Sequence, residues 1–302
     1  MSQQLTIQRP AEIQGVGLHT AVRCRVRFVP APADTGIVFR RVDLDGFEIA
    51  AHVRNVARVS YATSLMKQGV LLSTTEHVLA ALYSCGIDNV YVEVDALELP
   101  ILDGSSKPFI EMLAKAGARR LRRPRKYLRV VRALEFCDGD RRIGIYPCQE
   151  FRVHCFVNYD HPHVGPQQVE LTVDRQSFSR ELAPARTFGF MKDFAGLRGM
   201  GLIRGGSMDN AIVLDDQNVL NGPLRFRDEF GRHKALDLIG DLALVGRPLQ
   251  ARIVAHKAGH ALHTQLVTRL LADSSLWTET TEQRAEPAEV PAGVPISVPV
   301  LS

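Results

Sequence analysis

The chain has 302 residues, of which 45% are hydrophobic and 23% are charged. This length accommodates two ordinary domains, and the composition excludes both a disordered chain and a membrane protein. The N-terminal residues are polar and lack the apolar core of a signal peptide, and no apolar run approaches the roughly 18 residues that a membrane-spanning helix needs. We therefore expect a soluble protein with a sizeable core.

The cysteines indicate the cellular compartment of the protein, and the net charge indicates which classes of partner to expect. The five cysteines are odd in number and form no Cys-x-x-Cys pair, which favours reduced thiols in a cytoplasmic protein over a disulfide framework. The net charge is only +4, and much of the excess lies in one run from Arg119 to Lys126. Because nucleic-acid-binding proteins spread their charge over a face and interleave aromatic residues, we expect no nucleic-acid partner and interpret this run as a solvated linker. Weak attraction of the run to an anionic membrane surface is an alternative.

The first half of the chain alternates strand patterns with helix patterns. Alternating apolar residues predict strands at Val22 to Phe28 and Val90 to Val94, and apolar residues at helical spacing predict helices at Ser73 to Cys85 and Ser106 to Lys115. Residues from about 30 to 58 look like a loop-rich insertion. We expect an α+β domain over residues 1–124.

The second half repeats this style. Strands are predicted at Tyr127 to Val131, Arg142 to Tyr146, Phe151 to Tyr159 and Ile253 to Ala255, and helices at Asp228 to Val245 and His260 to Ala272. A second insertion is expected at about 188–206. We therefore expect a second α+β domain over residues 125–277. It should resemble the first, with helices layered on a mostly antiparallel sheet. The proline-containing tail, residues 278–302, is expected to be disordered.

The segment from Phe230 to Asp241 has the most informative spacing. On a helix, His233 and Asp237 lie one turn apart and project from one face, and Asp241 continues this face by another turn. An imidazole and a carboxylate at this spacing can converge on one metal ion. The alternative is a solvent-facing stripe with a contact between His233 and Asp237, which is the commoner meaning of such a motif in isolation.

Two further clusters carry polar groups suited to catalysis. Ser73 and Glu76 have the spacing of a helix capping box, which explains Glu76 without any chemistry. It does not explain His77, and an adjacent Glu and His suit a hydrolytic zinc site in which the His binds the metal and the Glu takes a proton from water. His260 follows a glycine at a strand-to-helix turn, where functional side chains are common.

Six blocks of sequence resemble, in order and spacing, the signature blocks of the UDP-3-O-acyl-N-acetylglucosamine deacetylase family, from about Gln4 to Ala272. The blocks are Gly15 to His19, Ser73 to His77, Leu102 to Ser105, Ala185 to Phe190, Asp228 to Lys234 and Lys257 to His260. The resemblance implies a hydrolase that removes the N-acetyl group of this UDP-sugar during lipid A synthesis. Two departures from the family pattern, Ala21 and Ser64, touch no implied ligand or proton carrier.

The resemblance implies a mononuclear zinc site. Its ligands are His77, His233 and Asp237, which leave one coordination position open, as a catalytic zinc site requires. Because His77 precedes the expected linker and the other two ligands follow it, the active site is expected between the two domains. The same three ligands would also accept Fe²⁺.

The resemblance also implies which groups handle protons and charge. Glu76 corresponds to the general base, and His260 to the acid that protonates the leaving amine. Asp241 would keep His260 charged, because a nearby opposite charge raises the pKa of an imidazole. Thr187 corresponds to a hydroxyl donor to the oxyanion.

Substrate contacts are implied in the same way. Lys234 would meet the diphosphate, Phe188 would pack near the sugar, and His19 would be a further active-site histidine. Apolar residues would form a passage for the 3-O-acyl chain, whereas ordinary packing of a small βαβ insertion also accounts for those after Phe188. The contacts expected along this passage are Met191, Phe194 and Leu202. Leu18 is expected to be a further substrate contact, and Tyr159 to stack on the uracil.

Two other functions compete with this assignment. A zinc hydrolase acting on another acylated amine, or a peptidase, would use nearly the same chemistry, but the chain lacks the H-E-x-x-H motif of many peptidases. A catalytically silent lipid- or carbohydrate-binding module would have no reason to keep the whole set of polar groups. No seam in the sequence suggests an obligate oligomer, so we expect a monomer.

Overall fold

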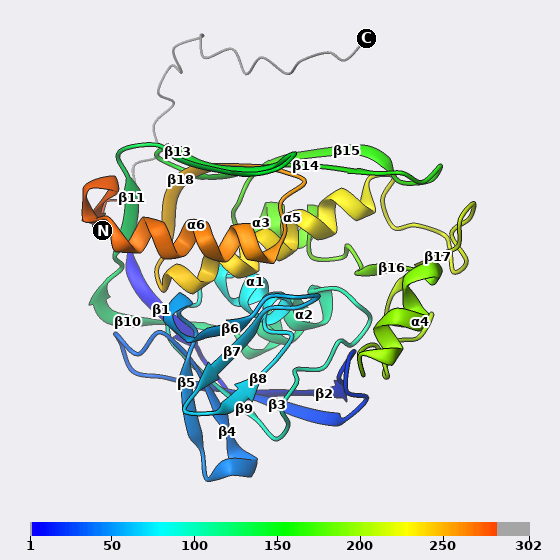
Figure 1. Cartoon of the computed structure of the whole chain (residues 1–302). Coiled ribbons are helices and arrows are strands. Elements are labelled where there is room, and N and C mark those ends of the chain that lie inside the picture. The colour runs from blue at the N-terminus through cyan, green and yellow to red at the C-terminus, as the bar shows by residue number, and fades with distance from the viewer. Residues whose placement is uncertain (1, 283–302) are drawn as a thin grey trace.

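In the computed structural model, which describes residues 2–282, two layers of helices lie between two β-sheets (Figure 1). The sheet of the first half and the helices α1 and α2 form the lower two layers of this view. The sheet of the second half and the helices α5 and α6 form the upper two. The α+β class with two domains, predicted from the sequence, is confirmed.

The first half contains three sheets. The largest has the strand order β2 (Ala11–Val16), β3 (Arg23–Pro30), β9 (Val90–Val94), β4 (Ile37–Arg41) and β5 (Phe47–Ala50). A smaller sheet joins β6 (Val56–Arg58), β7 (Ser64–Lys67) and β8 (Val70–Leu72), and β1 (Gln3–Ile7) pairs with β10 (Ala118–Pro124). The helices are α1 (Glu76–Ser84) and α2 (Lys107–Ala116), with the short 3₁₀ helices η1 (Val42–Leu44) and η2 (Val53–Asn55).

Strand alternation explains most of this half. Every second residue of β3 is buried, namely Cys24, Val26 and Phe28, as the predicted one-faced strand requires. The expected loop-rich insertion at residues 30–58 is wrong, because β4 lies inside the sheet, parallel to β9. Turn-forming residues before β4 conceal a strand that is only five residues long.

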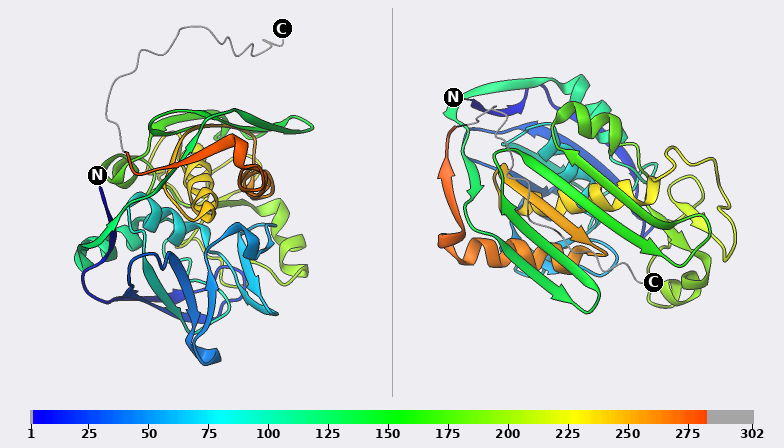
Figure 2. Two further views of the ribbon diagram at one scale, coloured as in Figure 1. Left: turned by 90° about the vertical axis from the view of Figure 1, so that its left-hand side faces the viewer. Right: turned by 90° about the horizontal axis from the view of Figure 1, so that it is seen from above.

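The second half is built on one seven-stranded sheet. Its strands are β12 (Leu134–Asp138), β13 (Arg141–Pro147), β18 (Leu249–His256), β11 (Tyr127–Val130) and β19 (Trp277–Thr280), with β14 (Phe151–Tyr159) on β18 and β15 (Gly165–Thr172) on β14. The helices are α3 (Arg175–Glu181), α5 (Glu229–Leu242) and α6 (His260–Ala272), with η3 (Ala243–Val245) and η4 (Ser274–Leu276). Viewed from above, this sheet covers α5 (Figure 2).

Two expectations about connecting segments need correction. The basic run after Ala118 is solvent-exposed as expected, but up to Pro124 it forms β10, which pairs with β1 instead of forming a loop. The tail was expected to be disordered from Thr278, but Thr278–Thr280 pair with β11 through backbone hydrogen bonds, which no local pattern shows. Residues 283–302 of that tail lie outside the described residues. We propose the domain division between residues 124 and 125, since β10 pairs within the first half and β11 within the second.

A small insertion projects from one end of the second half. It consists of β16 (Phe188–Phe190), α4 (Met191–Gly199) and β17 (Ile212–Leu214), and β16 pairs in parallel with β17. This is the βαβ unit expected near residues 188–206, although it extends to residue 214. Among residues 2–282, no helix is both long and apolar enough to cross a bilayer.

Candidate active site

The two halves meet where α1 crosses α5. The close approach depends on Gly240, since a Cβ atom at this position would stand 2.2 Å from the carbonyl oxygen of Glu76. With no side chain in the way, the first turn of α1 lies against the face of α5 that carries His233 and Asp237. Glu76 and His77, at the start of α1, are thereby brought to the seam between the domains.

Three side chains at this seam offer metal-binding atoms to one point. His77 Nε2 lies 3.6 Å from Asp237 Oδ1, and His233 Nε2 lies 3.4 Å from the same oxygen. One ligand atom from each residue lies within 4.8 Å of the other two, and all three side chains are buried. The structure therefore brings together the three metal ligands predicted from the sequence.

The protonation of these groups fits a divalent cation. Burial lowers the pKa of His233 to about 3, so this imidazole is neutral, and its Nδ1–H donates to the carbonyl oxygen of Ala185 at 3.1 Å. Its Nε2 is thus left free to bind a metal. Burial opposes ionisation of Asp237, but the ammonium group of Lys234 beside it favours the carboxylate, and the pKa of Asp237 lies well below the usual value. Imidazoles and a carboxylate are suitable ligands for zinc.

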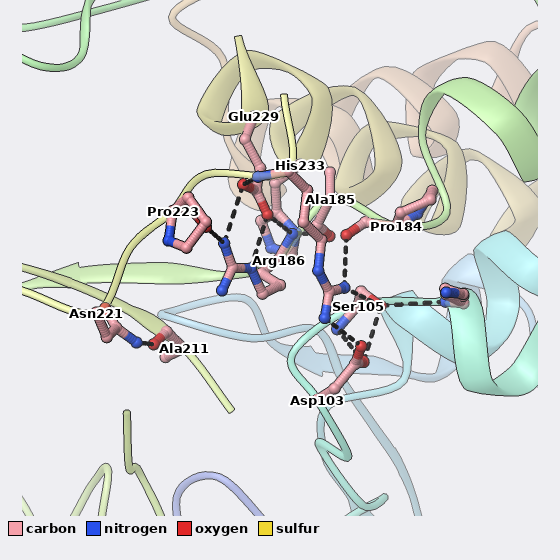
Figure 3. Close-up of polar contacts among 12 residues, drawn as sticks. Asp103, Ser105, Pro184, Ala185, Arg186, Ala211, Asn221, Pro223, Glu229 and His233 are labelled. Atoms are coloured by element: carbon pink, nitrogen blue, oxygen red, sulfur yellow. Dashed lines mark hydrogen bonds and ion pairs between the residues drawn. The ribbon is translucent and has the colours of Figure 1, made fainter. Parts of the chain in front are cut away.

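Figure 3 shows how the carbonyl group that orients His233 is held. The next residue, Arg186, forms a buried ion pair with Glu229, with its Nε 2.8 Å from Oε1. The backbone N–H of Arg186 donates to the same oxygen at 3.1 Å, and its Nη2 donates to the carbonyl oxygen of Pro223 at 3.0 Å. The orientation of the predicted ligand His233 therefore depends on this ion pair.

A second ion pair connects the segment before α5 to the first half. Arg225 binds Asp103 at 2.9 Å and donates to the carbonyl oxygen of Pro184 at 2.8 Å. Beside it, the backbone N–H of Thr187 donates to the carbonyl oxygen of Gly104 at 2.8 Å. Gly104 has a φ of +84°, which disfavours any other residue. Two of the sequence blocks thus meet here to place Thr187.

Glu76 has a role other than capping its helix. Thr75 is the N-cap residue of α1 and makes no side-chain capping bond, so the capping-box interpretation is wrong. The helix starts late because Thr74 has a φ of +59°. Instead, Oε2 of Glu76 accepts a hydrogen bond from the backbone N–H of Thr63 at 3.0 Å. Burial raises the pKa of Glu76, which brings a carboxylate toward the range of a general base.

On the opposite side, Asp241 and His260 form a tight pair. His260 Nδ1 lies 2.6 Å from Asp241 Oδ2. Burial alone would lower the pKa of His260, but the charge and hydrogen bond of Asp241 outweigh it and raise that pKa to about 9, so His260 is cationic at neutral pH. Sequence reasoning missed two further partners of Asp241, namely Thr63 and His263. The spacing of His260 and His263 on one helix was an available signal, whereas nothing local indicated Thr63.

These groups surround a cavity of about 330 Å³ at the domain seam. Ten of its lining residues were predicted from the sequence: Leu18, His19, Glu76, His77, Thr187, Phe188, His233, Lys234, Asp237 and His260. Sequence reasoning missed other lining residues, among them Tyr61, Thr74, Ile101, Asp138 and Arg141. The cavity therefore combines a metal-binding cluster, a buried carboxylate and a cationic histidine.

Comparison with known proteins agrees with this arrangement. The family described as UDP-3-O-acyl N-acetylglycosamine deacetylase matches residues 4–272. The chain belongs to this deacetylase family. It is 54% identical over 275 residues to the UDP-3-O-acyl-N-acetylglucosamine deacetylase of Solibacter usitatus, covering 91% of this chain and 93% of the relative. It is 43% identical over 285 residues to the enzyme of the same name from Myxococcus xanthus, covering 94% and 91%.

Two polar residues of this deacetylase-family cavity have surroundings that refine their expected roles. Lys234 Nζ lies 2.8 Å from Asp237 Oδ2 and 5.7 Å from the centroid of the Phe188 ring, so its charge is already paired with a predicted metal ligand. His19 is buried, burial lowers its pKa, and its Nε2 has no hydrogen-bond partner within residues 2–282. That nitrogen is a buried polar atom of a residue that lines the cavity.

Five residues predicted for this deacetylase site do not line the cavity itself, and one of them, Asp241, lies behind His260. Met191, Phe194 and Leu202 lie in or after α4, a helix with no buried residue, and Met191 is 49% exposed. Tyr159 packs edge-on against Phe188, with ring centroids 5.4 Å apart. Met191, Phe194 and Leu202 are therefore placed beside the cavity, and Tyr159 belongs to an aromatic cluster behind it.

Proposed function

We propose that this protein hydrolyses the N-acetyl group of UDP-3-O-acyl-N-acetylglucosamine, releasing acetate and UDP-3-O-acyl-glucosamine in lipid A synthesis. Membership of the deacetylase family supports this assignment. The observation that carries it is the meeting, in one cavity at the domain seam, of the cluster His77, His233 and Asp237 with Glu76 and His260. This set supplies a metal site, a base and an acid, which amide hydrolysis needs.

The metal is proposed to be zinc, held by His77, His233 and Asp237, with Fe²⁺ as a substitute that the same ligands accept. When bound, the ion polarises the amide carbonyl and lowers the pKa of water. Lys234 pairs with the outer oxygen of Asp237. This contact resembles the outer partners that orient ligands in other metal sites.

Glu76 is proposed to act as the general base. It accepts one proton from the attacking water, whose oxygen forms the new bond to the acetyl carbon. The raised pKa of this buried carboxyl group suits the transfer. Thr187 lies at the cavity wall, and its hydroxyl donates a hydrogen bond to the carbonyl oxygen of the acetyl group, which becomes negative as the new bond forms.

His260 is proposed to act as the general acid. Because its Nδ1 is bonded to Asp241, its Nε2 is the nitrogen that can serve the cavity. It gives a proton to the sugar nitrogen as the carbon–nitrogen bond breaks, since an amine leaves poorly when unprotonated. The immediate products are a neutral amine and acetic acid, which keeps the second hydrogen of the water while the first remains on Glu76. The acetic acid then ionises to acetate, and its proton restores His260 to the cation.

The remaining assignments concern the substrate. We propose that the acyl chain lies along Leu18 and the apolar side chains of α4 and its following loop, which include Met191, Phe194 and Leu202. Two backbone hydrogen bonds support this. The N–H of Gly205 donates to the carbonyl oxygen of Leu18 at 3.0 Å and the N–H of Arg204 to that of His19 at 3.1 Å, so the insertion is docked at the cavity. Phe188 is assigned to the sugar, His19 to a further polar contact, and Lys234 to the diphosphate.

The cellular setting is also a proposal. We propose a cytoplasmic monomer that binds no nucleic acid. The exposed basic strand β10 is suited to weak attachment to an anionic membrane surface. A zinc hydrolase acting on another acylated amine is the second candidate, because the catalytic groups alone do not distinguish acylated amines.

Acetate release from UDP-3-O-acyl-N-acetylglucosamine tests the proposal directly. The assay is run on the native protein, on protein treated with a chelator, and on chelated protein resupplied with zinc. Activity that disappears with chelation and returns with zinc would support reaction, substrate and cofactor together. A folded, zinc-loaded protein that releases no acetate from this substrate, but deacetylates another acylated amine, would favour the second candidate.

A further inference from the structure

We propose that Thr63 and His263 are positioning residues that fix the carboxylate of Asp241, and that Thr63 also ties this carboxylate to Glu76. The base and the acid of the site would then be held by one hydrogen-bonded chain that crosses the domain seam. The inference rests on the proposed function, because it concerns the groups that transfer protons there.

The first observation is that both oxygens of Asp241 have partners. Oδ1 accepts from the hydroxyl of Thr63 at 2.5 Å, and Oδ2 lies 2.6 Å from Nδ1 of His260 and 2.8 Å from Nδ1 of His263. Asp241 and Thr63 are fully buried, and His263 is 1% exposed. With three donors around it, the carboxylate has a single orientation. Because His260 Nδ1 is bonded to this carboxylate, the orientation of the His260 ring is fixed as well.

The second observation is that Thr63 contacts both ends of the site. Its backbone N–H donates to Glu76 at 3.0 Å, while its hydroxyl donates to Asp241 and lies 3.1 Å from His260 Nδ1. Thr63 belongs to the loop between β6 and β7 in the first half, whereas Asp241 and His260 belong to the second. One residue therefore sets the position of the base relative to the acid.

The third observation is that Thr63 is itself held firmly. Its carbonyl oxygen accepts from the hydroxyl of Thr75 at 3.0 Å and from the backbone N–H of Thr75 at 3.2 Å. Thr75 precedes α1, which begins at Glu76. The loop is thus fastened to the helix that carries the base, and displacement of either would move both.

His263 completes the arrangement from the second half. It lies three residues after His260 on α6, so both rings project from one face of the helix toward Asp241. Burial lowers the pKa of His263, so this ring is a neutral donor. It stabilises the ionised carboxylate without competing with His260 for the role of cation.

Each residue is tested by a matched pair of variants in the metal-loaded protein. Thr63→Val removes the hydroxyl at nearly constant volume, whereas Thr63→Ser retains it. His263→Leu removes the ring donor, whereas His263→Asn retains an N–H near the position of Nδ1. We expect Thr63→Val and His263→Leu to lower kcat on the order of 10- to 100-fold, the worth of a hydrogen bond to a charged group. KM and metal content should change little in these two variants. The control variants Thr63→Ser and His263→Asn should retain most of the wild-type kcat.

A purely structural role is separated by combining each variant with Asp241→Ala. If Thr63 and His263 act through Asp241, their substitutions should have little further effect on kcat in this background. Additive losses, or equal rates for the two members of each pair, would overturn the inference while leaving the proposed function standing. An Asp241→Ala protein with undiminished kcat would instead remove the proposed acid pair, and the inference with it. If Thr63→Val does not fold, the two His263 variants decide the matter alone.

Discussion

His260, the first residue of α6, and Asp241, in the last turn of α5, are joined by a contact of 2.6 Å between Nδ1 and Oδ2. The contact lies next to the domain seam and is almost completely buried. Because little water screens the carboxylate, its effect on the charge of the imidazole is large. The ionisation of His260 is therefore controlled by a single neighbour.

This relationship predicts how the rate depends on pH. The rate should rise as Glu76 loses its proton, at a pH above the usual range of a glutamate since burial raises its pKa. It should fall again as His260 loses its proton near pH 9, the value to which Asp241 raises its pKa. In Asp241→Asn the raising charge is gone, so the alkaline limb should move to lower pH. The measurement is kcat against pH, and Glu111→Gln, an exposed change on α2, is the control. An alkaline limb that stays in place would mean that another group is the acid.

Gly240→Ala should disturb the crossing of α1 and α5. The added Cβ would stand 2.2 Å from the carbonyl oxygen of Glu76, so α1 must shift, and overpacking of this kind costs about 1–3 kcal/mol in folding free energy. A shift of the base by a fraction of an ångström also lowers kcat, by about tenfold or more. Thermal unfolding and acetate release would measure the two effects.

Gly196→Ala is the matched control for this prediction. Gly196 also lies within a helix, but a Cβ there meets nothing within 4 Å. Alanine should therefore be neutral or stabilising at this position. If both variants behaved alike, the close approach at Gly240 would have no importance for the site.

Removal of a predicted ligand should release the metal. Asp237→Ala deletes one of three ligand groups and leaves Lys234 without its ion pair, so the variant should lose most of its metal in dialysis against a chelator. Asp241→Asn, one helical turn further along, should keep its metal and lose only rate. The metal content of both proteins, measured by mass spectrometry, distinguishes them. Full occupancy in Asp237→Ala would show that the ligand set is assigned wrongly.

Periodicity predicted the elements that the site depends on, because each of them buries one continuous face. The helix expected at His260 to Ala272 has those bounds in the structure, and β9 agrees equally well. The strands β4, β10 and β19 were missed. The strands β10 and β19 pair with strands that are far away in the chain, and β4 is short and preceded by turn-forming residues. No local pattern therefore identifies them.

The same distinction applies to the site. His233, Asp237 and Asp241 share one face of α5, and their convergence follows from helix geometry alone. That His77 would join them required the resemblance to a family, because the crossing of α1 with α5 depends on long-range packing. Thr63 reaches Asp241 across 178 positions of sequence, and no motif of its own marks it.

The ion pair behind His233 should contribute strongly to stability. Arg186→Met would leave Glu229 ionised and fully buried without its partner, which typically costs about 3–5 kcal/mol of folding free energy. Replacing both partners by apolar residues should cost less than the single change. Lys107→Met, which breaks an exposed pair with Glu111 on α2, is the control and should cost less than about 0.5 kcal/mol. Urea unfolding measures all three, and equal losses for the buried and the exposed pair would contradict the prediction.

The end of the described chain gives a last prediction. Thr278 and Glu279 continue β19 along β11, and Glu279 pairs with Lys126 at 2.8 Å and with Arg247. A protein ending at Trp277 would lose these bonds and expose the edge of β11, whereas one ending at Glu282 would keep them. The shorter protein should therefore unfold at a lower temperature than the longer one. Its kcat should change little, because β19 lies at the edge of the sheet and contributes no residue to the catalytic cavity. Equal unfolding temperatures would mean that the pairing of β19 with β11 adds nothing to the stability of the domain.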